Sequence, residues 1–265
     1  MPDKSDLIDR INRFLKQEKE VYGNFNPELI DPGTDKDVTP AADEKKQSPE
    51  PATPTSEPEA NISEEPATEI NAEAALPYCK NLEELKALCA ETPTLKTDLE
   101  GTNLVFGVGN PNADLMLIGE APGKNEDKQG EPFVGRAGKL LNKILQAINF
   151  EREDVYIANI LKHRPPDNRD PLPEERQRSL PFLYRQIELI DPKIILCLGR
   201  ISAQTLLDTN KPMKQLRGEF HPFMDNRELM VTFHPAALLR NPGWKRDTWE
   251  DVQKLRARYD EITGS

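Results

Sequence analysis

Apolar and polar positions change along the carboxyl-terminal part of the chain in a pattern that predicts alternating strands and helices. Short apolar runs with the length of buried strands occur at 113–120, 155–161, 193–199 and 228–235. Apolar residues at the three- and four-residue spacing of amphipathic helices occur at 138–150, 172–190, 201–207 and 243–262. This alternation predicts a three-layer α/β/α fold with a central, mainly parallel, four-stranded sheet.

The amino-terminal part has a different pattern. Residues 1–23 place apolar side chains at helical spacing and predict an amphipathic helix, which either docks on the body or binds a protein partner. Residues 24–77 are acidic and rich in proline, with no aromatic residue from Asp31 to Pro77. Such a segment buries too little apolar surface to offset its ordering entropy. We therefore expect a disordered linker in front of a folded domain over 78–265.

Charge is distributed unevenly between these parts. The net charge of −11 over 265 residues argues, taken as a whole, against a protein that grips phosphate. Residues 1–80, however, hold 18 acidic and 9 basic side chains, a net charge of −9. Residues 81–265 hold 28 acidic and 26 basic side chains, a net charge of −2. The folded part is close to neutral, so a local basic groove is permitted.

Several protein classes are excluded by simple features. The chain lacks an apolar run long enough to span a membrane, and its first ten residues are too polar for a secretory signal. Its three cysteines form no close-spaced pair, which argues against a disulfide framework and against a CxxC metal site. We expect a cytoplasmic protein without membrane contact, acting as a monomer.

The ends of the predicted strands carry the candidate chemistry, because binding sites of parallel sheets lie beyond the carboxyl ends of their strands. Those ends hold Glu120, Asn159, Gly199 and His234. The segment GEAPGK at 119–124 is no phosphate loop of a nucleotide triphosphatase, since it has too few residues between its glycines and Asn125 where Ser or Thr should bind magnesium. Glu126 and Asp127 are expected to form the solvated start of a helix or loop.

Five segments, taken in order, point to one family. They are GEAPG at 119–123, GEPFVGRAGKLL at 130–141, YIANILKHRPPDNRDP at 156–171, CLGRISAQTLL at 197–207 and FHPAALLRNP at 233–242. In order and spacing they resemble the family 4 uracil-DNA glycosylases. The resemblance implies hydrolysis of the N-glycosidic bond of uracil in single- or double-stranded DNA, the first step of base-excision repair. The alternative is a DNA- or partner-binding module on the same fold without turnover.

The resemblance implies roles for the residues that match. Glu120, with the backbone of Gly119 and Ala121, would line the pocket and face the sugar carbon under attack. Its carboxylate would either orient water or stabilise the sugar cation. Phe133 would stack on the flipped uracil, although a place in the apolar core is the simpler structural reading.

Two further matching residues would act on the base. Asn159 would read its polar edge, since an amide offers a donor for uracil O4 and an acceptor for N3–H, the reverse of what cytosine requires. His234 would donate to uracil O2 as a neutral imidazole and so stabilise charge that develops during bond cleavage. The structural alternatives are a turn cap for Asn159 and a bond from His234 to a backbone carbonyl.

Contacts to the DNA duplex follow from the same resemblance. The segment AALLR at 236–240 would enter the duplex, with Leu238 or Leu239 as the apolar wedge. Candidate phosphate contacts, each of which is equally well a plain surface residue, are Lys162, Arg164, Arg169 and Arg240.

The resemblance fails at the cofactor. Family 4 enzymes carry a 4Fe-4S cluster held by four cysteines, and the four positions are occupied here by Cys89, Thr92, His163 and Ser179. Iron–sulfur clusters need several thiolate ligands. We predict that the cluster is lost, that no cofactor is bound, and that the stretch 94–103 belongs to its replacement. His163 could alternatively attack the sugar, but its place at a ligand position argues against that.

Overall fold

The structure, a computed structural model, describes residues 72–264. These residues belong to one compact unit, Ile70–Ser265. The helix predicted at 1–23, and most of the linker predicted at 24–77, lie outside the described residues. No helix of the described part is both long enough and apolar enough to cross a membrane.

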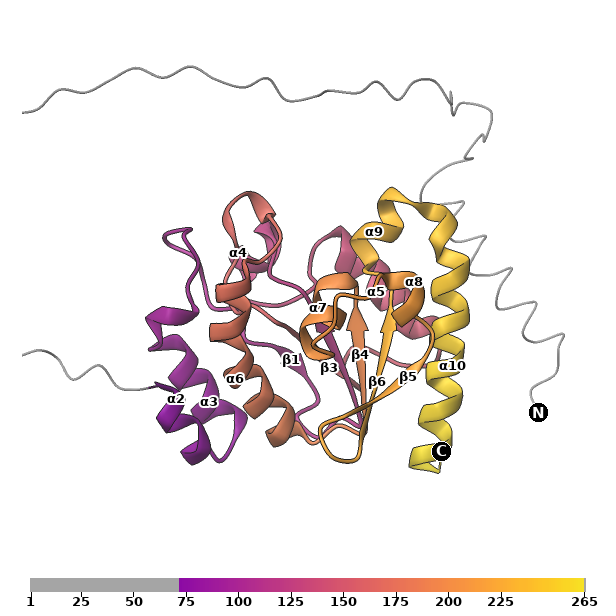
Figure 1. Ribbon diagram of the computed structural model, residues 1–265, viewed down its shortest axis with the longest axis horizontal. Coiled ribbons are helices and arrows are strands. Elements are labelled where there is room, and N and C mark those ends of the chain that lie inside the picture. The colour runs from indigo at the N-terminus through magenta and orange to yellow at the C-terminus, as the bar shows by residue number, and fades with distance from the viewer. Residues whose placement is uncertain (1–71, 265) are drawn as a thin grey trace, which may run out of the picture. The chain divides into compact units, whose positions relative to one another are not determined.

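A six-stranded sheet forms the centre of the unit, with the strand order β1-β3-β2-β4-β6-β5 (Figure 1). The strands are β1 (Val108–Gly109), β2 (Leu115–Gly119), β3 (Tyr156–Asn159), β4 (Ile194–Leu198), β5 (Phe220–Phe223) and β6 (Arg227–Thr232). The inner strands β3, β2, β4 and β6 pair in parallel, and they are the four strands that the apolar runs predict. The predicted α/β fold with a mainly parallel sheet is confirmed.

The two edge strands are antiparallel and were not predicted. β1 is only two residues long, and β5 contains Pro222 and has just one buried residue, so neither forms an apolar run. Proline cannot donate to a sheet ladder, which is why it is tolerated only at an edge. The sheet is therefore wider than the predicted four strands, but its parallel centre is unchanged.

Helices cover both faces of the sheet, as a parallel sheet requires. One face packs on α6 (Pro173–Ile190) and α7 (Arg200–Leu206), and the other packs on α5 (Arg136–Ala147) and α10 (Lys245–Thr263). β2 and β4 are buried along their whole length. The alternation of their side chains places Met116 in one core and Leu117 in the other.

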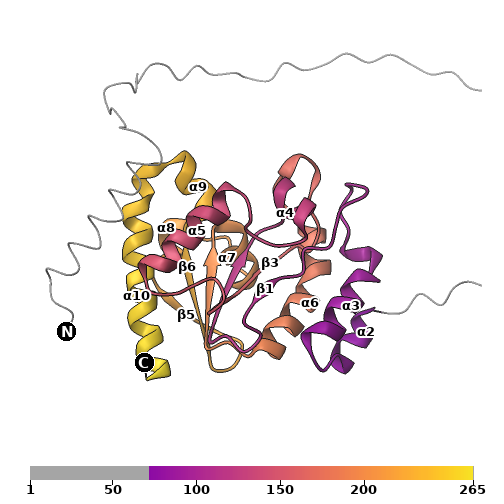
Figure 2. The same cartoon turned by 180° about the vertical axis from the view of Figure 1, so that it is seen from behind.

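Short helices at the amino end of the unit pack against α6 (Figures 1 and 2). Those that contact α6 directly are η2 (Leu76–Tyr78), α3 (Leu82–Ala90) and η3 (Pro93–Leu95), and α2 (Ala72–Ala75) contacts η2. Leu76, Leu85 and Cys89 share a buried apolar cluster with Phe182 of α6. The boundary that the sequence predicts at residue 78 therefore falls inside the compact unit.

The remaining helices lie at the end of the molecule toward which the parallel strands point (Figure 1). They are α4 (Lys124–Gln129), η4 (Pro166–Asn168), α8 (Met213–Leu216), α9 (Pro235–Arg240) and η5 (Pro242–Trp244). All of them except η5 are joined to a strand by a short connection, and η5 lies between α9 and α10. This arrangement gathers the strand-end residues and several loops at one edge of the sheet.

Candidate active site

A groove with a volume of about 1170 Å³ opens at the carboxyl ends of the parallel strands. All four strand-end residues singled out by the sequence line it, namely Glu120, Asn159, Gly199 and His234. Ala121 and Phe133 line it as well. The structure thus brings together residues that are more than a hundred positions apart in the chain.

Gly119 ends β2 beside Asn159, because β2 and β3 pair these two residues directly, and it is not itself among the residues that line the groove. A Cβ atom on Gly119 would lie 2.6 Å from Cζ of Phe133 and would collide with Oδ1 of Asn159. Side chains at this distance clash, so only glycine lets the amide and the phenyl ring converge here. The pocket depends on this missing side chain.

Asn159 presents an unsatisfied acceptor to that pocket. The residue is 2% exposed, and its Oδ1 atom makes no hydrogen bond within the described residues. A buried acceptor without a partner typically costs about 1–3 kcal/mol and is rare in folded proteins. The turn-cap alternative for Asn159 would have given this oxygen a partner. The orphaned oxygen indicates a place for a donor from a ligand.

Phe133 is held in a strained backbone conformation, with φ of 54°. Left-handed φ is unfavourable for a bulky residue and persists only where the surroundings enforce it. Arg152 donates to the carbonyl of Phe133 at 3.3 Å and also to that of Pro132. The ring is only 6% exposed and packs in the core cluster of α5. It therefore belongs to the core and, at the same time, lines the pocket.

Glu126 holds the backbone that directly follows Phe133 through its carboxylate. Its Oε1 atom accepts hydrogen bonds from the backbone N–H of Val134 at 3.0 Å and of Gly135 at 2.9 Å. Asp127, next in the chain, accepts from the backbone N–H of Asn103 at 2.8 Å. Both carboxylates lie in the first turn of α4, as expected, but they fix neighbouring loops instead of only facing solvent.

His234 faces Phe133 across the pocket, with 5.4 Å between the ring centroids. It caps α9, and its Nδ1 atom accepts a hydrogen bond from the backbone N–H of Ala236 at 3.1 Å. A ring nitrogen that accepts carries no proton, so the neutral imidazole carries its proton on Nε2. Burial, reinforced by the positive charge of Arg240, lowers the pKa of His234 to about 4. At neutral pH this residue is an uncharged donor.

Glu120 has a strongly shifted carboxyl group. Burial, followed by repulsion from Asp170, raises its pKa to about 7, while Arg200, Arg176 and Arg240 act in the opposite direction. A shifted carboxyl in a cleft is typical of a functional group. Its backbone is fixed, since the Glu120 carbonyl accepts from the N–H of Leu161 at 3.1 Å.

The residues predicted to contact DNA differ in their exposure and in whether they line the groove. Arg240 is exposed and lines the groove. Leu238 is 1% exposed and packs in the core, whereas Leu239 keeps part of its surface accessible. Arg164 lies outside the groove lining and donates to Oδ1 of Asn168 at 2.7 Å. Arg169 is engaged by both carboxylate oxygens of Glu175, at 2.7 and 2.8 Å.

Lys162 corrects one prediction, because it is fully buried and cannot touch phosphate. Its Nζ atom donates to Oε1 of Gln186 at 2.7 Å and to the carbonyls of Asn159 at 3.1 Å and Phe106 at 3.3 Å. A buried ammonium is retained only where it is hydrogen-bonded in this way. Lys162 thus supports the end of β3 from behind the pocket.

The four positions of the expected cluster ligands do not fit an iron–sulfur cluster. Cys89 is the one thiol among them, and burial raises its pKa to about 11. The other three bond within the protein: Thr92 Oγ1 to the Leu88 carbonyl at 2.6 Å, His163 Nδ1 with Thr102 Oγ1 at 3.0 Å, and Ser179 Oγ to the Ile160 carbonyl at 2.7 Å. Among residues 72–264, no three His, Cys, Asp or Glu side chains are placed to hold a metal ion.

Comparison with known proteins gives consistent results. The family model of the uracil DNA glycosylase superfamily matches residues 106–253, which include all five segments. The chain is 44% identical over 161 residues to the type-4 uracil-DNA glycosylase of Archaeoglobus fulgidus, covering 58% of this chain and 81% of that protein. It is 42% identical over 162 residues to the type-4 enzyme of Thermotoga maritima, covering 60% and 84%.

A more distant relative is also named a uracil-DNA glycosylase, of type 5. The type-5 uracil-DNA glycosylase of Thermus thermophilus is 28% identical over 149 residues, covering 49% of this chain and 68% of that protein. The family match spans more than half of the chain and contains the whole strand-end pocket. This chain therefore belongs to the uracil-DNA glycosylase superfamily, alongside its type-4 members.

Proposed function

We propose that this protein hydrolyses the N-glycosidic bond of uracil in DNA, releasing free uracil and leaving an abasic site. The observation that supports it most directly is the unpaired Oδ1 atom of Asn159, 2% exposed in a pocket that also holds the neutral donor His234. The type-4 relatives, named as uracil-DNA glycosylases, agree with this activity.

Base recognition follows from the polarity of Asn159. Uracil offers a donor at N3 to Oδ1 and an acceptor at O4 to Nδ2. Cytosine offers an acceptor at N3 and a donor at its exocyclic amine, so both pairs would clash and buried groups would remain unpaired. A base reaches the pocket only after leaving the helical stack, and the ring of Phe133 would provide the face on which it stacks.

Bond cleavage would use the two remaining polar groups of the pocket. As the bond between C1′ and N1 of the base breaks, its electron pair leaves with uracil and negative charge collects on O2. The Nε2–H of His234 would donate to that oxygen, which stabilises charge that exists mainly in the transition state. Water then attacks C1′ to form the new C1′–O bond, and the proton that it gives up neutralises the released uracil anion. An ionised Glu120 would either stabilise the sugar cation or orient this water.

Entry into the duplex is assigned to α9. Of the two leucines predicted as the wedge, Leu239 keeps accessible surface while Leu238 is held in the core. An apolar wedge must be free to replace the extruded base. We therefore assign the wedge to Leu239 and a phosphate contact to its neighbour Arg240, which is exposed at the groove.

We also propose that direct contacts replace the iron–sulfur cluster of the relatives. The stretch 94–103 bonds to the segment that carries the third ligand position: Thr102 contacts His163, and Thr97 Oγ1 donates to the carbonyl of Arg164 at 2.6 Å. Cys89 packs in an apolar cluster instead of facing a metal. These contacts would tie the amino-terminal helices to the body without iron.

The finer points of the partner prediction stay predictions. The substrate is uracil-containing DNA, single- or double-stranded, and we expect a monomer. The residues before 72 that could bind a protein partner lie outside the described part of the chain. The cytoplasmic location likewise rests on the sequence alone.

One assay tests the activity. Single- and double-stranded oligonucleotides with one uracil are incubated with the protein, abasic sites are cleaved with alkali, and matched oligonucleotides carry cytosine or thymine instead. We expect cleavage only at uracil, lost in Asn159→Ala and retained in Asn112→Ala, an exposed asparagine in the turn before β2. Cleavage no greater than that of Asn159→Ala would refute the proposal.

A further inference from the structure

An aromatic pair at the groove takes no part in the activity proposed above. The rings of Phe233 and Trp244 stack with 4.7 Å between centroids and 15° between planes. Both residues line the groove, and Trp244 is 40% exposed. Large aromatic side chains are usually buried, so an accessible indole inside a groove is an unusual feature.

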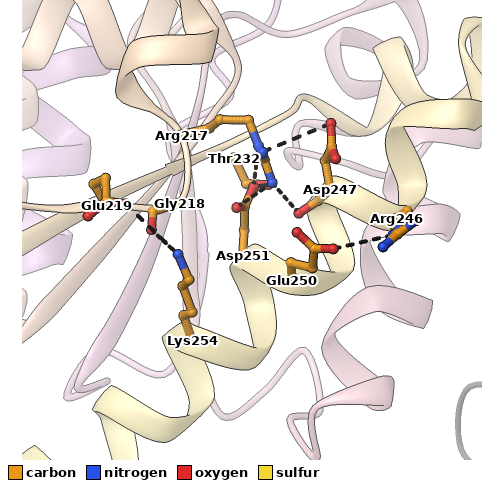
Figure 3. Close-up of polar contacts among 9 residues, drawn as sticks. All are labelled: Arg217, Gly218, Glu219, Thr232, Arg246, Asp247, Glu250, Asp251 and Lys254. Atoms are coloured by element: carbon orange, nitrogen blue, oxygen red, sulfur yellow. Dashed lines mark hydrogen bonds and ion pairs between the residues drawn. The ribbon is translucent and has the colours of Figure 1, made fainter. Parts of the chain in front are cut away.

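The pair rests on a rigid polar support. The guanidinium of Arg217 lies 5.6 Å from the centre of the Phe233 ring. Arg217 in turn donates to Asp251 of α10 at 2.7 and 3.1 Å, and Asp251 also accepts from Thr232 Oγ1 at 2.7 Å (Figure 3). Asp251 is 1% exposed. These bonds tie β6, α10 and the residue that follows α8 together, and they fix the guanidinium that contacts the Phe233 ring.

The charges around Trp244 favour a nucleic acid as its ligand. Arg240 and Lys214 are exposed, line the same groove, and form no ion pair with a carboxylate among residues 72–264. The carboxylate of Asp247, which also lines it, faces Arg217 at 3.9 Å. A flat aromatic face in a groove that also carries exposed cations is the combination that binds single-stranded DNA, where bases stack and phosphates meet positive charge.

The position of the pair selects which base it would meet. Phe233 directly precedes His234 in the chain, so the aromatic pair adjoins the uracil pocket. Trp244 ends η5, which follows α9, the helix assigned to duplex entry. We propose that Trp244 stacks on the nucleobase adjacent to the extruded uracil on the same strand. This subsite rests on the proposed function, because it presumes a uracil held at Asn159.

A coupling experiment tests the proposed stack. The ligand is a single-stranded oligonucleotide with 2′-fluoro-2′-deoxyuridine, whose glycosidic bond resists cleavage. In a set of otherwise identical strands, one base at a time around the uracil is replaced by an abasic tetrahydrofuran unit. We expect Trp244→Ala to weaken binding about 10-fold, as one lost base stack does. Removing the base at one adjacent position should weaken binding by the native protein by the same factor. The same removal should not weaken binding by Trp244→Ala any further.

Controls separate stacking from folding and from the proposed function. Trp244→Phe, which keeps a stacking face, should stay within about threefold of the native protein. Trp249→Phe, the matched change on α10 away from the groove lining, should retain the coupling. If Trp244→Ala and removal of a base weaken binding independently and additively at every tested position, the proposed stack is wrong, even if the native protein releases uracil. Failure of the native protein to release uracil, with the coupling intact, would defeat only the proposed function.

Discussion

The Nδ1 atom of His234 accepts a hydrogen bond from the backbone N–H of Ala236 at 3.1 Å. This bond caps α9 and, in the same geometry, leaves the ring proton on Nε2, where the proposed mechanism needs a donor. The helix assigned to duplex entry and the group assigned to the leaving base are therefore mechanically joined. A displacement of α9 would break the hydrogen bond that keeps the ring proton of His234 on Nε2.

Removal of His234 should slow bond cleavage more than binding. Loss of one donor to a developing oxyanion typically costs about 10²–10³ in kcat. We expect the single-turnover rate constant of His234→Ala, measured with excess protein, to fall by that factor. The protein concentration that gives the half-maximal rate should change far less. His221→Gln is the matched control, since His221 lies on β5 and bonds to the Leu216 carbonyl at 3.1 Å. A loss below tenfold would remove His234 from the mechanism.

The pH dependence should follow Glu120. Its pKa is raised to about 7, so the group is largely protonated at pH 6 and ionised at pH 8. Both roles considered for it need the ionised form. The value of kcat/KM should thus rise with pH, with a midpoint near 7, and level off above about pH 8. His234, with a pKa of about 4, adds no second pH-dependent step in this range.

Two variants check that assignment. Glu120→Gln should be slow and show no rise near pH 7. Arg240→Gln removes a positive charge that lowers the pKa of Glu120, so the rise should move to higher pH, whatever the loss in DNA affinity. An unmoved midpoint in Arg240→Gln, or an intact rise in Glu120→Gln, would assign the titration to another group.

The sequence predicts the parallel centre of the fold and the strand-end residues because both follow from local patterns. Apolar runs define β2, β3, β4 and β6, and parallel strands necessarily end at one edge. β5 escapes prediction because Pro222 interrupts it and only its last residue is buried. Its place depends on pairing with β6, which no local pattern reveals.

The supporting residues of the site are hidden from the sequence for a similar reason. The sequence predicts Glu126 as a solvated residue, because its hydrogen bonds to the backbone of Val134 and Gly135 are visible only in the folded structure. Lys162 reads as a surface cation because buried lysines are rare. Trp244 reads as part of a helical apolar face, whereas α10 begins only at Lys245 and leaves the indole beside the groove. Each role depends on contacts between distant segments.

Gly119→Ala should disable the pocket without unfolding the domain. The added methyl group would meet the amide of Asn159 and, at 2.6 Å, the ring of Phe133. Because the amide is displaced from its reading position, we expect uracil release to fall at least about 100-fold, comparable to a lost catalytic donor. Gly243→Ala, where a Cβ meets nothing within 4 Å, is the control. Equal activity of the two variants would contradict this geometry.

Iron should be dispensable for folding. The donor set of Cys89, Thr92, His163 and Ser179 offers one thiol, so protein made in iron-supplied cells should lack the visible absorption of an iron–sulfur cluster. Its thermal unfolding and uracil release should be unchanged by a chelator. Stoichiometric iron that is lost on chelation, together with a lower Tm, would show that other residues of the chain complete a cluster.

Removal of the acidic amino-terminal segment should raise nonspecific DNA affinity at low salt. Residues 1–69 hold 17 acidic and 8 basic side chains, a net charge of −9, and leave a near-neutral domain. The deletion must stop before Ile70, where the compact unit begins and beyond which Leu76 enters a buried cluster. Repulsion between this segment and phosphate reaches far at low salt, since the Debye length is about 30 Å at 0.01 M.

We expect the domain over 70–265 to bind uracil-free DNA at least about threefold more tightly than the full chain at 0.01 M salt, with the difference vanishing near 0.15 M, where the Debye length falls to about 8 Å. A full-length variant with the Asp and Glu residues of 1–69 changed to Asn and Gln should match the truncated domain, because length is kept and only charge is removed. Fluorescence anisotropy titrations at the two salt concentrations measure the DNA affinities of the truncated domain, the neutralised variant and the native chain. If the neutralised variant instead behaves like the native chain, charge is not the means by which the segment acts on DNA binding.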